Sequence, residues 1–240
     1  MKVFIHIGHS RTGTTTLQAL LTANRELLRN NGIDYPPVGI LLPPKGIAQH
    51  KLAFSLLPEW PKFAINAKAS RDTCWAELTE HLNSESNNNL DKLLLSSEAF
   101  SSLDESAIQF VCNYFKGHSV TAIFTRRDPE EWRRSWREHR ITRGHHVPEP
   151  TVPAPDINTP IIEKWSARFD LRVVDYGPSC TREILGHVGI NANELHPVAK
   201  RNVQPSRQAI DLINQLNLID LNKQNRLTFN KKIVNFFNDL

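Results

Sequence analysis

Residues 3–21 read VFIHIGHSRTGTTTLQALL, and they constrain the fold of this chain more than any other stretch. The first five residues are apolar apart from one histidine and rich in β-branched side chains, which predicts a short buried strand over 3–7. A loop of glycine, serine and threonine follows, and leucines at helical spacing then predict a helix over 14–30. A strand that runs through a glycine loop into a helix is typical of the opening of an alternating α/β chain.

Three further apolar runs predict strands over 92–97, 119–125 and 171–176. Their apolar residues do not alternate strictly with polar ones, as in strands of a parallel sheet that is covered on both faces. Helical patterns lie over 14–30, 70–83, 104–116, 129–143, 159–169, 205–219 and 223–238. This order predicts a single domain over 1–240 with a three-layer α/β/α architecture and a central, mostly parallel sheet.

Two proline-rich segments, 35–62 and 144–160, interrupt the alternation. Proline is excluded from the interior of helices and sheets, so both segments are expected to be loops or lids. Either could cover an active site, and both could equally be ordinary surface loops.

Composition narrows the class of protein. The three cysteines are widely separated and form no CxxC pair, which argues against a disulfide framework and against a zinc site. No apolar run approaches the length of about 18 residues needed to span a membrane, and the first residues lack the layout of a signal peptide. We therefore expect a cytoplasmic protein without an integral membrane segment. The net charge of +4 suits a protein that handles small polyanions.

The loop after the first predicted strand has the features of a phosphate cradle. It spans Gly8, His9, Ser10, Arg11, Thr12, Gly13, Thr14, Thr15 and Thr16. A loop that leads into a helix presents free backbone N–H groups and the positive end of the helix dipole to an anion. The two glycines match the GxxxxGK[ST] pattern of nucleoside-triphosphate loops, but Thr14 occupies the lysine position. The cation lies three residues earlier, at Arg11, which counts against kinase or ATPase chemistry.

A second anion-binding element is predicted in residues 119–140, SVTAIFTRRDPEEWRRSWREHR. Arg127 follows a strand, at the edge where open α/β sheets bind ligands, and Ser135 follows eight residues later on a helix. A guanidinium and a hydroxyl are suitable donors to an oxyanion. The other arginines of this helix alternate with glutamates, which is more typical of a solvated, salt-bridged face than of a nucleic-acid patch.

The two elements together resemble the sulfotransferase family that uses 3′-phosphoadenosine 5′-phosphosulfate (PAPS), in its bacterial carbohydrate-type members. The family's KTGTT loop corresponds to RTGTT, Arg11 to Thr15, and its Arg and Ser for the 3′-phosphate correspond to Arg127 and Ser135 in RDPEEWRRS. A late donor loop corresponds to KRNVQPSRQAIDLINQLN, with Arg201 and Asn202. The family's loop lysine is Arg11 here.

The resemblance implies a P-loop NTPase-like sulfotransferase fold and an enzyme that transfers a sulfuryl group from PAPS to a hydroxyl, releasing 3′,5′-ADP. It further implies a small-molecule or carbohydrate acceptor, such as a glycolipid, with no metal ion and no nucleic-acid partner. Two alternatives stay open: a P-loop kinase-like phosphotransferase, and a non-catalytic nucleotide-binding protein of the same fold.

Catalysis by such an enzyme needs a cation on the leaving group and a general base near the acceptor hydroxyl. Arg11 is the candidate cation. Glu98, at the end of the strand in LLLSSE, is the first candidate base, His50 the second and His9 the third. His6 is flanked by isoleucines, and we expect it to be a buried structural histidine.

Overall fold

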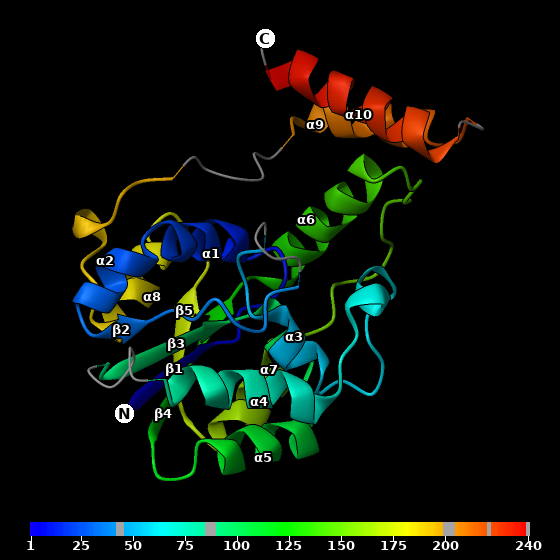
Figure 1. Ribbon diagram of the computed structural model, residues 1–240. Coiled ribbons are helices and arrows are strands. Elements are labelled where there is room, and N and C mark those ends of the chain that lie inside the picture. Colours follow the sequence, from blue (N-terminus) through cyan, green and yellow to red (C-terminus); the bar gives the residue numbers. More distant parts are fainter. Residues whose placement is uncertain (42–45, 85–89, 199–204, 220–221, 239–240) are drawn as a thin grey trace. The chain divides into compact units, whose positions relative to one another are not determined.

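The computed structural model describes residues 1–41, 46–84, 90–198, 205–219 and 222–238 (Figure 1). The chain divides into two compact units, each described here by itself. The first comprises Met1–Arg127 and Ile157–Ala199, and the second comprises Asp128–Asp156 and Lys200–Leu240. The single domain over 1–240 stays a prediction.

The first unit contains a five-stranded sheet in the order β2-β3-β1-β4-β5. Its strands are β1 (Lys2–His6), β2 (Ile33–Asp34), β3 (Lys92–Ser96), β4 (Ser119–Arg126) and β5 (Asp170–Asp175). Every neighbouring pair is parallel. The predicted α/β class with a central parallel sheet is confirmed, and β1 lies at its centre.

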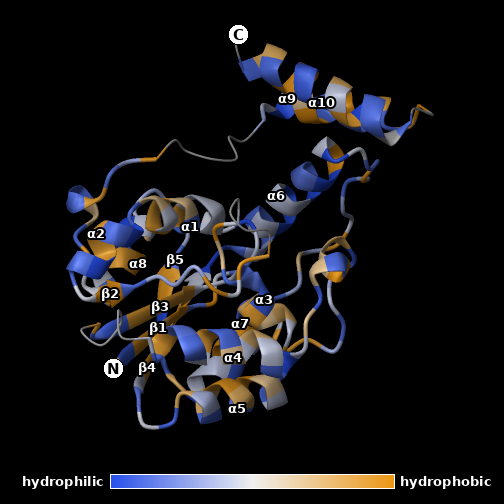
Figure 2. Cartoon of the chain, viewed as in Figure 1, coloured by the Kyte–Doolittle hydropathy of each residue, from blue (hydrophilic) through white to orange (hydrophobic). Residues whose placement is uncertain are grey.

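Helices cover both faces of this sheet (Figure 1). On one face lie α3 (His50–Phe54), η1 (Lys62–Ala67), α4 (Arg71–Leu82), η3 (Glu98–Ser102), α5 (Glu105–Tyr114) and α7 (Thr159–Ser166). On the other lie α1 (Thr14–Ala23), α2 (Arg25–Asn30) and α8 (Cys180–Val188), while the 3-10 helix η4 (Ala192–Glu194) follows α8. Both faces are buried, which explains the apolar colouring of the middle residues of β1 and β3 in Figure 2.

The strands alternate between the two cores with a period of two. Val3 and Ile5 join the core that includes α4 and α5, and Phe4 joins the core with α1 and α8. The same alternation directs the side chain of His6 toward α1, because it lies two residues after Phe4. A buried polar residue thus enters the second core at the carboxyl end of the central strand.

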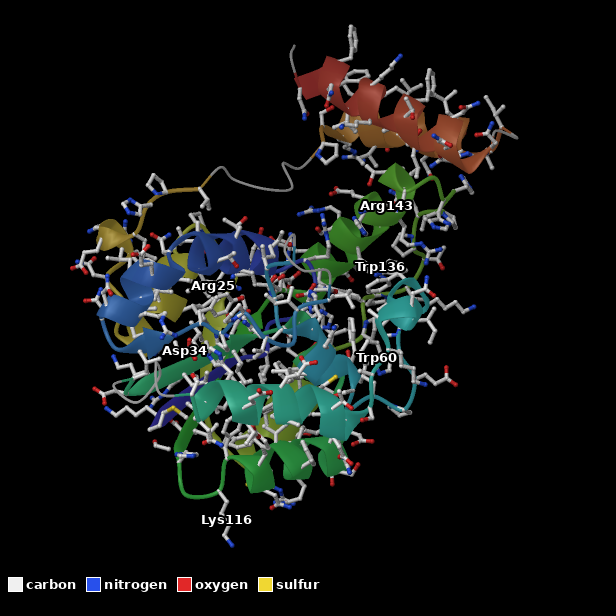
Figure 3. All side chains as sticks on the ribbon, in the orientation of Figure 1. Arg25, Asp34, Trp60, Lys116, Trp136 and Arg143 are labelled. Atoms are coloured by element: carbon white, nitrogen blue, oxygen red, sulfur yellow. The ribbon has the colours of Figure 1, made fainter. Side chains whose placement is uncertain are left out.

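Polar contacts tie the covering elements to the edge of the sheet beside β2. Asp34 Oδ2 lies 2.7 Å from Nε2 of His81 on α4. Arg25 Nε donates to the carbonyl of Tyr35 at 3.0 Å. Figure 3 labels both Arg25 and Asp34. It also labels Lys116, which projects from the turn between α5 and β4.

The second unit consists of α6 (Pro129–Thr142), α9 (Arg207–Leu216) and α10 (Lys223–Asn238), with Trp136 and Arg143 labelled on and just after α6 in Figure 3. Its core includes Ile141, Ile213 and Ile233. The start of α6 is as predicted: the side chain of Asp128 accepts the N–H of Glu131 at 2.9 Å, and Pro129 is the first helical residue.

Several elements differ from the sequence-based expectation. The helix predicted over 14–30 is two helices, because the buried side chain of Asn24 interrupts it and exchanges hydrogen bonds with the backbone of His196. Segment 35–62 is not wholly loop, since it contains α3 and the start of η1, and α8 was not predicted. Residues 145–158 contain neither helix nor strand, as expected for a proline-rich loop.

None of the helices within the described ranges is long and apolar enough to cross a membrane. The expectation of a cytoplasmic location stays a prediction.

Candidate functional site

Three neighbouring strands bring predicted site residues to one edge of the sheet. The glycine-threonine loop follows β1, Glu98 follows β3 and Arg127 follows β4. Because all three strands are parallel, their carboxyl ends share this edge, where open α/β sheets bind ligands. The loop occupies the central position, with Glu98 on one side and Arg127 on the other.

The loop has the backbone of an anion cradle. Gly13, the residue before α1, has φ 78° and ψ 6°, and it offers no side chain to cap the helix. No side chain therefore caps the start of α1, where Thr16 and Leu17 donate their N–H groups to the carbonyl of Gly13 and the N–H groups of the preceding threonines face the loop side of the helix. Arg11 has φ 68° and is the one non-glycine residue with positive φ among those that the structure describes. For a residue with a side chain, this left-handed conformation costs on the order of 1 kcal/mol.

Side chains within the loop differ in their exposure. Thr12 and Thr14 are buried, and the Thr12 hydroxyl donates to the carbonyl of His9 at 2.5 Å. Arg11, Thr15 and Thr16 are half-buried. The pKa of His9 is lowered by burial, against an opposing interaction with the backbone of Ser10. His9 is thus neutral near pH 7 and can act as a hydrogen-bonding group.

His6 supports the loop from inside the sheet. Its Nδ1 lies 2.9 Å from the Ser96 hydroxyl on β3, and its Nε2 lies 3.2 Å from the Thr125 hydroxyl on β4. A Cβ added to Gly8 would be only 2.7 Å from His6 Nε2, so the loop passes directly over the imidazole and tolerates only glycine there. Burial lowers the pKa of His6 to about 4, against an opposing attraction from Glu98. The predicted buried structural histidine is confirmed.

Glu98 and His50, predicted separately as candidate bases, lie close together. His50 Nε2 is 3.9 Å from Glu98 Oε2, and His50 Nδ1 is 2.8 Å from the Ser97 hydroxyl. The side chains are partly exposed, 22% for His50 and 31% for Glu98, so a solute can reach both. The pKa of His50 is lowered by burial, and the nearby Glu98 carboxylate only partly offsets this.

Two buried glutamines that were not predicted hold this pair in place. Gln18 on α1 donates from Nε2 to the Ser96 hydroxyl at 3.2 Å and to Glu98 Oε2 at 3.3 Å. Gln49 pairs with β3 through its backbone N–H to Ser96 O and through its side-chain oxygen, which accepts the N–H of Ser96 at 2.9 Å. The signal for Gln18 is visible in the sequence, since it is a polar residue beside Leu17 and Leu21 on the buried face of a helix.

Arg127 contacts the loop directly. Its NH1 donates to the carbonyl of Arg11 at 2.6 Å, and its guanidinium lies 4.4 Å from the ring centroid of Tyr176. The Asn158 side chain donates to the carbonyl of Arg127 at 2.9 Å. Tyr176, which follows β5, was not predicted as part of the site.

Three further donor residues were predicted from the sequence. Ser135 is a residue of α6 in the second unit, and Arg201 and Asn202 fall outside the described residues. On α6, Arg137 forms an ion pair with Glu149 at 3.1 Å, as expected for a salt-bridged face.

A cavity of about 490 Å³ lies in the first unit between residues 37–40 and α4. Lys51, Glu77 and Glu80 are among its lining residues, but no loop residue, Glu98 or Arg127 is. Among the residues that the structure describes, no group of three His, Cys, Asp or Glu side chains could hold a metal ion.

Comparisons with known proteins find similarity among solved structures. No protein-family model matches the chain, and neither does any curated protein. Among solved structures, the chain is similar to a sulfotransferase from Alicyclobacillus acidocaldarius, with 13% sequence identity, 93% of each chain covered and a TM-score of 0.46. A similarity at this level carries no conclusion about activity, so the function proposed below rests on the chain's own residues.

The environment of His6 predicts a pH dependence of stability. Its pKa is about 4 when folded and 6.5 when exposed, so only the unfolded state gains a proton as the pH falls through this window. The free energy of unfolding should therefore fall by about 2 kcal/mol from pH 7 to pH 5 through this residue alone. Denaturant unfolding of His6→Gln at both pH values should show a correspondingly smaller loss, and an equal loss in both proteins would contradict this account.

Proposed function

We propose that the protein is a sulfotransferase that moves a sulfuryl group from PAPS to a hydroxyl of a carbohydrate or glycolipid and releases 3′,5′-ADP. One observation carries the proposal: the glycine-threonine loop with Arg11 lies between Arg127 and the Glu98–His50 pair, at the ends of three neighbouring parallel strands. Sulfuryl transfer needs cationic groups that bind the donor on one side of the sulfur atom and a base that activates the acceptor hydroxyl on the other.

The donor would bind with its 5′-phosphosulfate in the loop from Gly8 to Thr16. The N–H groups at the start of α1 and the guanidinium of Arg11 supply the positive potential, and Thr15 and Thr16 supply hydroxyl donors. Arg127 and Ser135 are proposed to bind the 3′-phosphate, together with Arg201 and Asn202, as the family resemblance implies. The reaction is proposed to need no metal ion.

Glu98 is proposed as the general base, with His50 beside it. The gap of 3.9 Å between Glu98 Oε2 and His50 Nε2 leaves room for one hydroxyl oxygen within hydrogen-bond distance of both atoms. In the reaction, that oxygen forms a bond to sulfur and the bridging S–O bond breaks. The hydroxyl proton passes to Glu98, and the electron pair of the broken bond goes to the 5′-phosphate, where Arg11 stabilises it.

Two other functions make different demands on the loop. A kinase-like phosphotransferase needs a lysine on the β- and γ-phosphates, and its position is occupied by Thr14, which is buried. A non-catalytic nucleotide-binding protein would need the loop but no accessible base. The partial exposure of Glu98 and His50 favours the enzyme.

Nucleotide selectivity tests the proposed donor. Isothermal titration calorimetry should show tighter binding of 3′,5′-ADP than of ATP with Mg²⁺, because two separate phosphate sites fit a nucleotide with phosphates on both ends of its ribose. Tight binding of ATP–Mg²⁺ without binding of 3′,5′-ADP would instead support the phosphotransferase.

The role of Arg11 is tested by substitutions that keep or remove its positive charge. Transfer of labelled sulfate from PAPS, to an acceptor or to water, should persist or rise in Arg11→Lys, because the cation is kept. In Arg11→Ala it should fall by about 100-fold or more, as when one charge-stabilising donor is removed from an active site. An Arg11→Ala protein at full rate would show that the side chain has no part in the reaction.

The role of Glu98 is tested by a neutral isostere. Glu98→Gln should lower the rate of transfer by about 100-fold, the usual contribution of a general base, while the affinity for 3′,5′-ADP stays unchanged. His50→Gln serves as the comparison, and a larger loss there than in Glu98→Gln would make His50 the base.

A further inference from the structure

We infer that Arg127 is a positioning residue that latches the glycine-threonine loop in its ligand-ready conformation. Arg127 is proposed above to bind the 3′-phosphate of PAPS. Its guanidinium would also hold the carbonyl of Arg11 and so fix the loop backbone that binds the 5′-phosphosulfate. The latch itself rests on contacts within the first unit, and only its consequence for nucleotide binding rests on the proposed function.

The latch acts at the most strained point of the loop. Arg11 has φ 68°, a conformation that an L side chain rarely adopts, and its carbonyl accepts the Arg127 NH1 hydrogen bond at 2.6 Å. Hydrogen bonds from a charged donor are stronger than those between neutral groups. Because residue 11 is an arginine and not a glycine, its left-handed backbone conformation costs free energy. The hydrogen bond from Arg127 can offset this cost.

Three contacts fix the latch in turn. The Tyr176 ring lies under the Arg127 guanidinium at 4.4 Å, and Asn158 binds the Arg127 carbonyl. The same ring also reaches the end of the loop, since a Cβ added to Gly13 would lie 3.4 Å from Tyr176 Cε2. Tyr176 is itself tied to β4 by its N–H, which donates to the carbonyl of Arg126 at 2.7 Å. Arg127 thus holds the loop at Arg11, and the Tyr176 ring lies near Gly13 at the end of the loop.

The neighbouring arginine provides a matched control. Arg126 carries the same charge at the end of the same strand, but it pairs with the Asp175 carboxylate at 2.7 Å and 3.1 Å. Its side chain is about half exposed, and its guanidinium is directed to Asp175 on β5. A loss of charge at 126 changes the electrostatics of this region without touching the latch.

The two possible roles of Arg127, holding the loop or only binding the 3′-phosphate, predict different effects on the binding of a nucleotide without a 3′-phosphate. A guanidinium has five N–H donors, so one can hold the Arg11 carbonyl while others face a phosphate. If Arg127 served only the 3′-phosphate, its removal would leave binding of adenosine 5′-phosphosulfate unchanged. If Arg127 also fixes the loop, its removal weakens the binding of this nucleotide as well.

The experiment compares Arg127→Met, Tyr176→Leu and the control Arg126→Met with the unmodified full chain. Hydrogen exchange of the amides in residues 9–14, measured without any nucleotide, should be about tenfold faster in Arg127→Met, as expected for the loss of one charged hydrogen bond. Tyr176→Leu, which keeps the Arg127 charge, should also accelerate exchange, and Arg126→Met should not. Tyr176→Leu keeps the test valid if Arg127→Met does not fold.

Calorimetry then tests the consequence. Arg127→Met should lose about tenfold in affinity for adenosine 5′-phosphosulfate, and more for 3′,5′-ADP. Unchanged hydrogen exchange in both Arg127→Met and Tyr176→Leu would overturn the inference. So would a loss of affinity in Arg127→Met that is confined to 3′,5′-ADP. If the unmodified chain bound neither nucleotide while Arg127→Met still accelerated exchange, the latch would stand and the proposed function would fail.

Discussion

The site depends on one buried interaction, the pair of hydrogen-bond contacts that His6 makes across the centre of the sheet. Its two ring nitrogens contact hydroxyls of Ser96 on β3 and Thr125 on β4, so a single neutral imidazole joins three strands at their carboxyl ends. Burial keeps the ring neutral near pH 7 by lowering its pKa, and a neutral ring can both donate and accept a hydrogen bond. The loop packs against this ring at Gly8. The Ser96 hydroxyl also accepts a hydrogen bond from the Gln18 side chain, which donates to Glu98 as well. The anion cradle and the carboxylate are therefore supported by the same polar layer.

Parallel topology explains why so few residues suffice. In a parallel sheet, every strand delivers its next residues to the same edge, and side chains two residues apart point to the same face. His6, Ser96 and Thr125 therefore meet beneath α1, while the residues that follow their strands surround the loop. The strand order β3-β1-β4 is enough to bring the glycine-threonine loop, the Glu98 carboxylate and Arg127 to neighbouring positions.

The sequence predicted what depends on local patterns and missed what depends on long-range contacts. Four of the five strands, the loop, the start of α6 and the burial of His6 follow from apolar runs, glycine positions and helical spacing, all visible within a few neighbours. The proximity of His50 to Glu98 was not predicted, because it depends on Gln49 pairing with β3 across 47 residues of chain. Tyr176 was missed for the same reason, since nothing in its own neighbourhood indicates that Arg127 lies over its ring. The break at Asn24 also depends on a distant partner, the backbone at His196.

The choice of arginine at position 11 has a consequence for the whole site. A guanidinium keeps its proton at any working pH, so Arg11 can stabilise charge on a leaving phosphate but cannot release a proton to it. In the proposed reaction, the acceptor's proton goes to Glu98 or His50, which are both partly exposed, and the leaving phosphate receives no proton from Arg11. The loop side acts through fixed positive charge and backbone N–H groups, and such electrostatic groups are effective only when they are held in place before the reaction begins. Rigid support by His6 below and Arg127 at the side is therefore what a permanently charged loop requires.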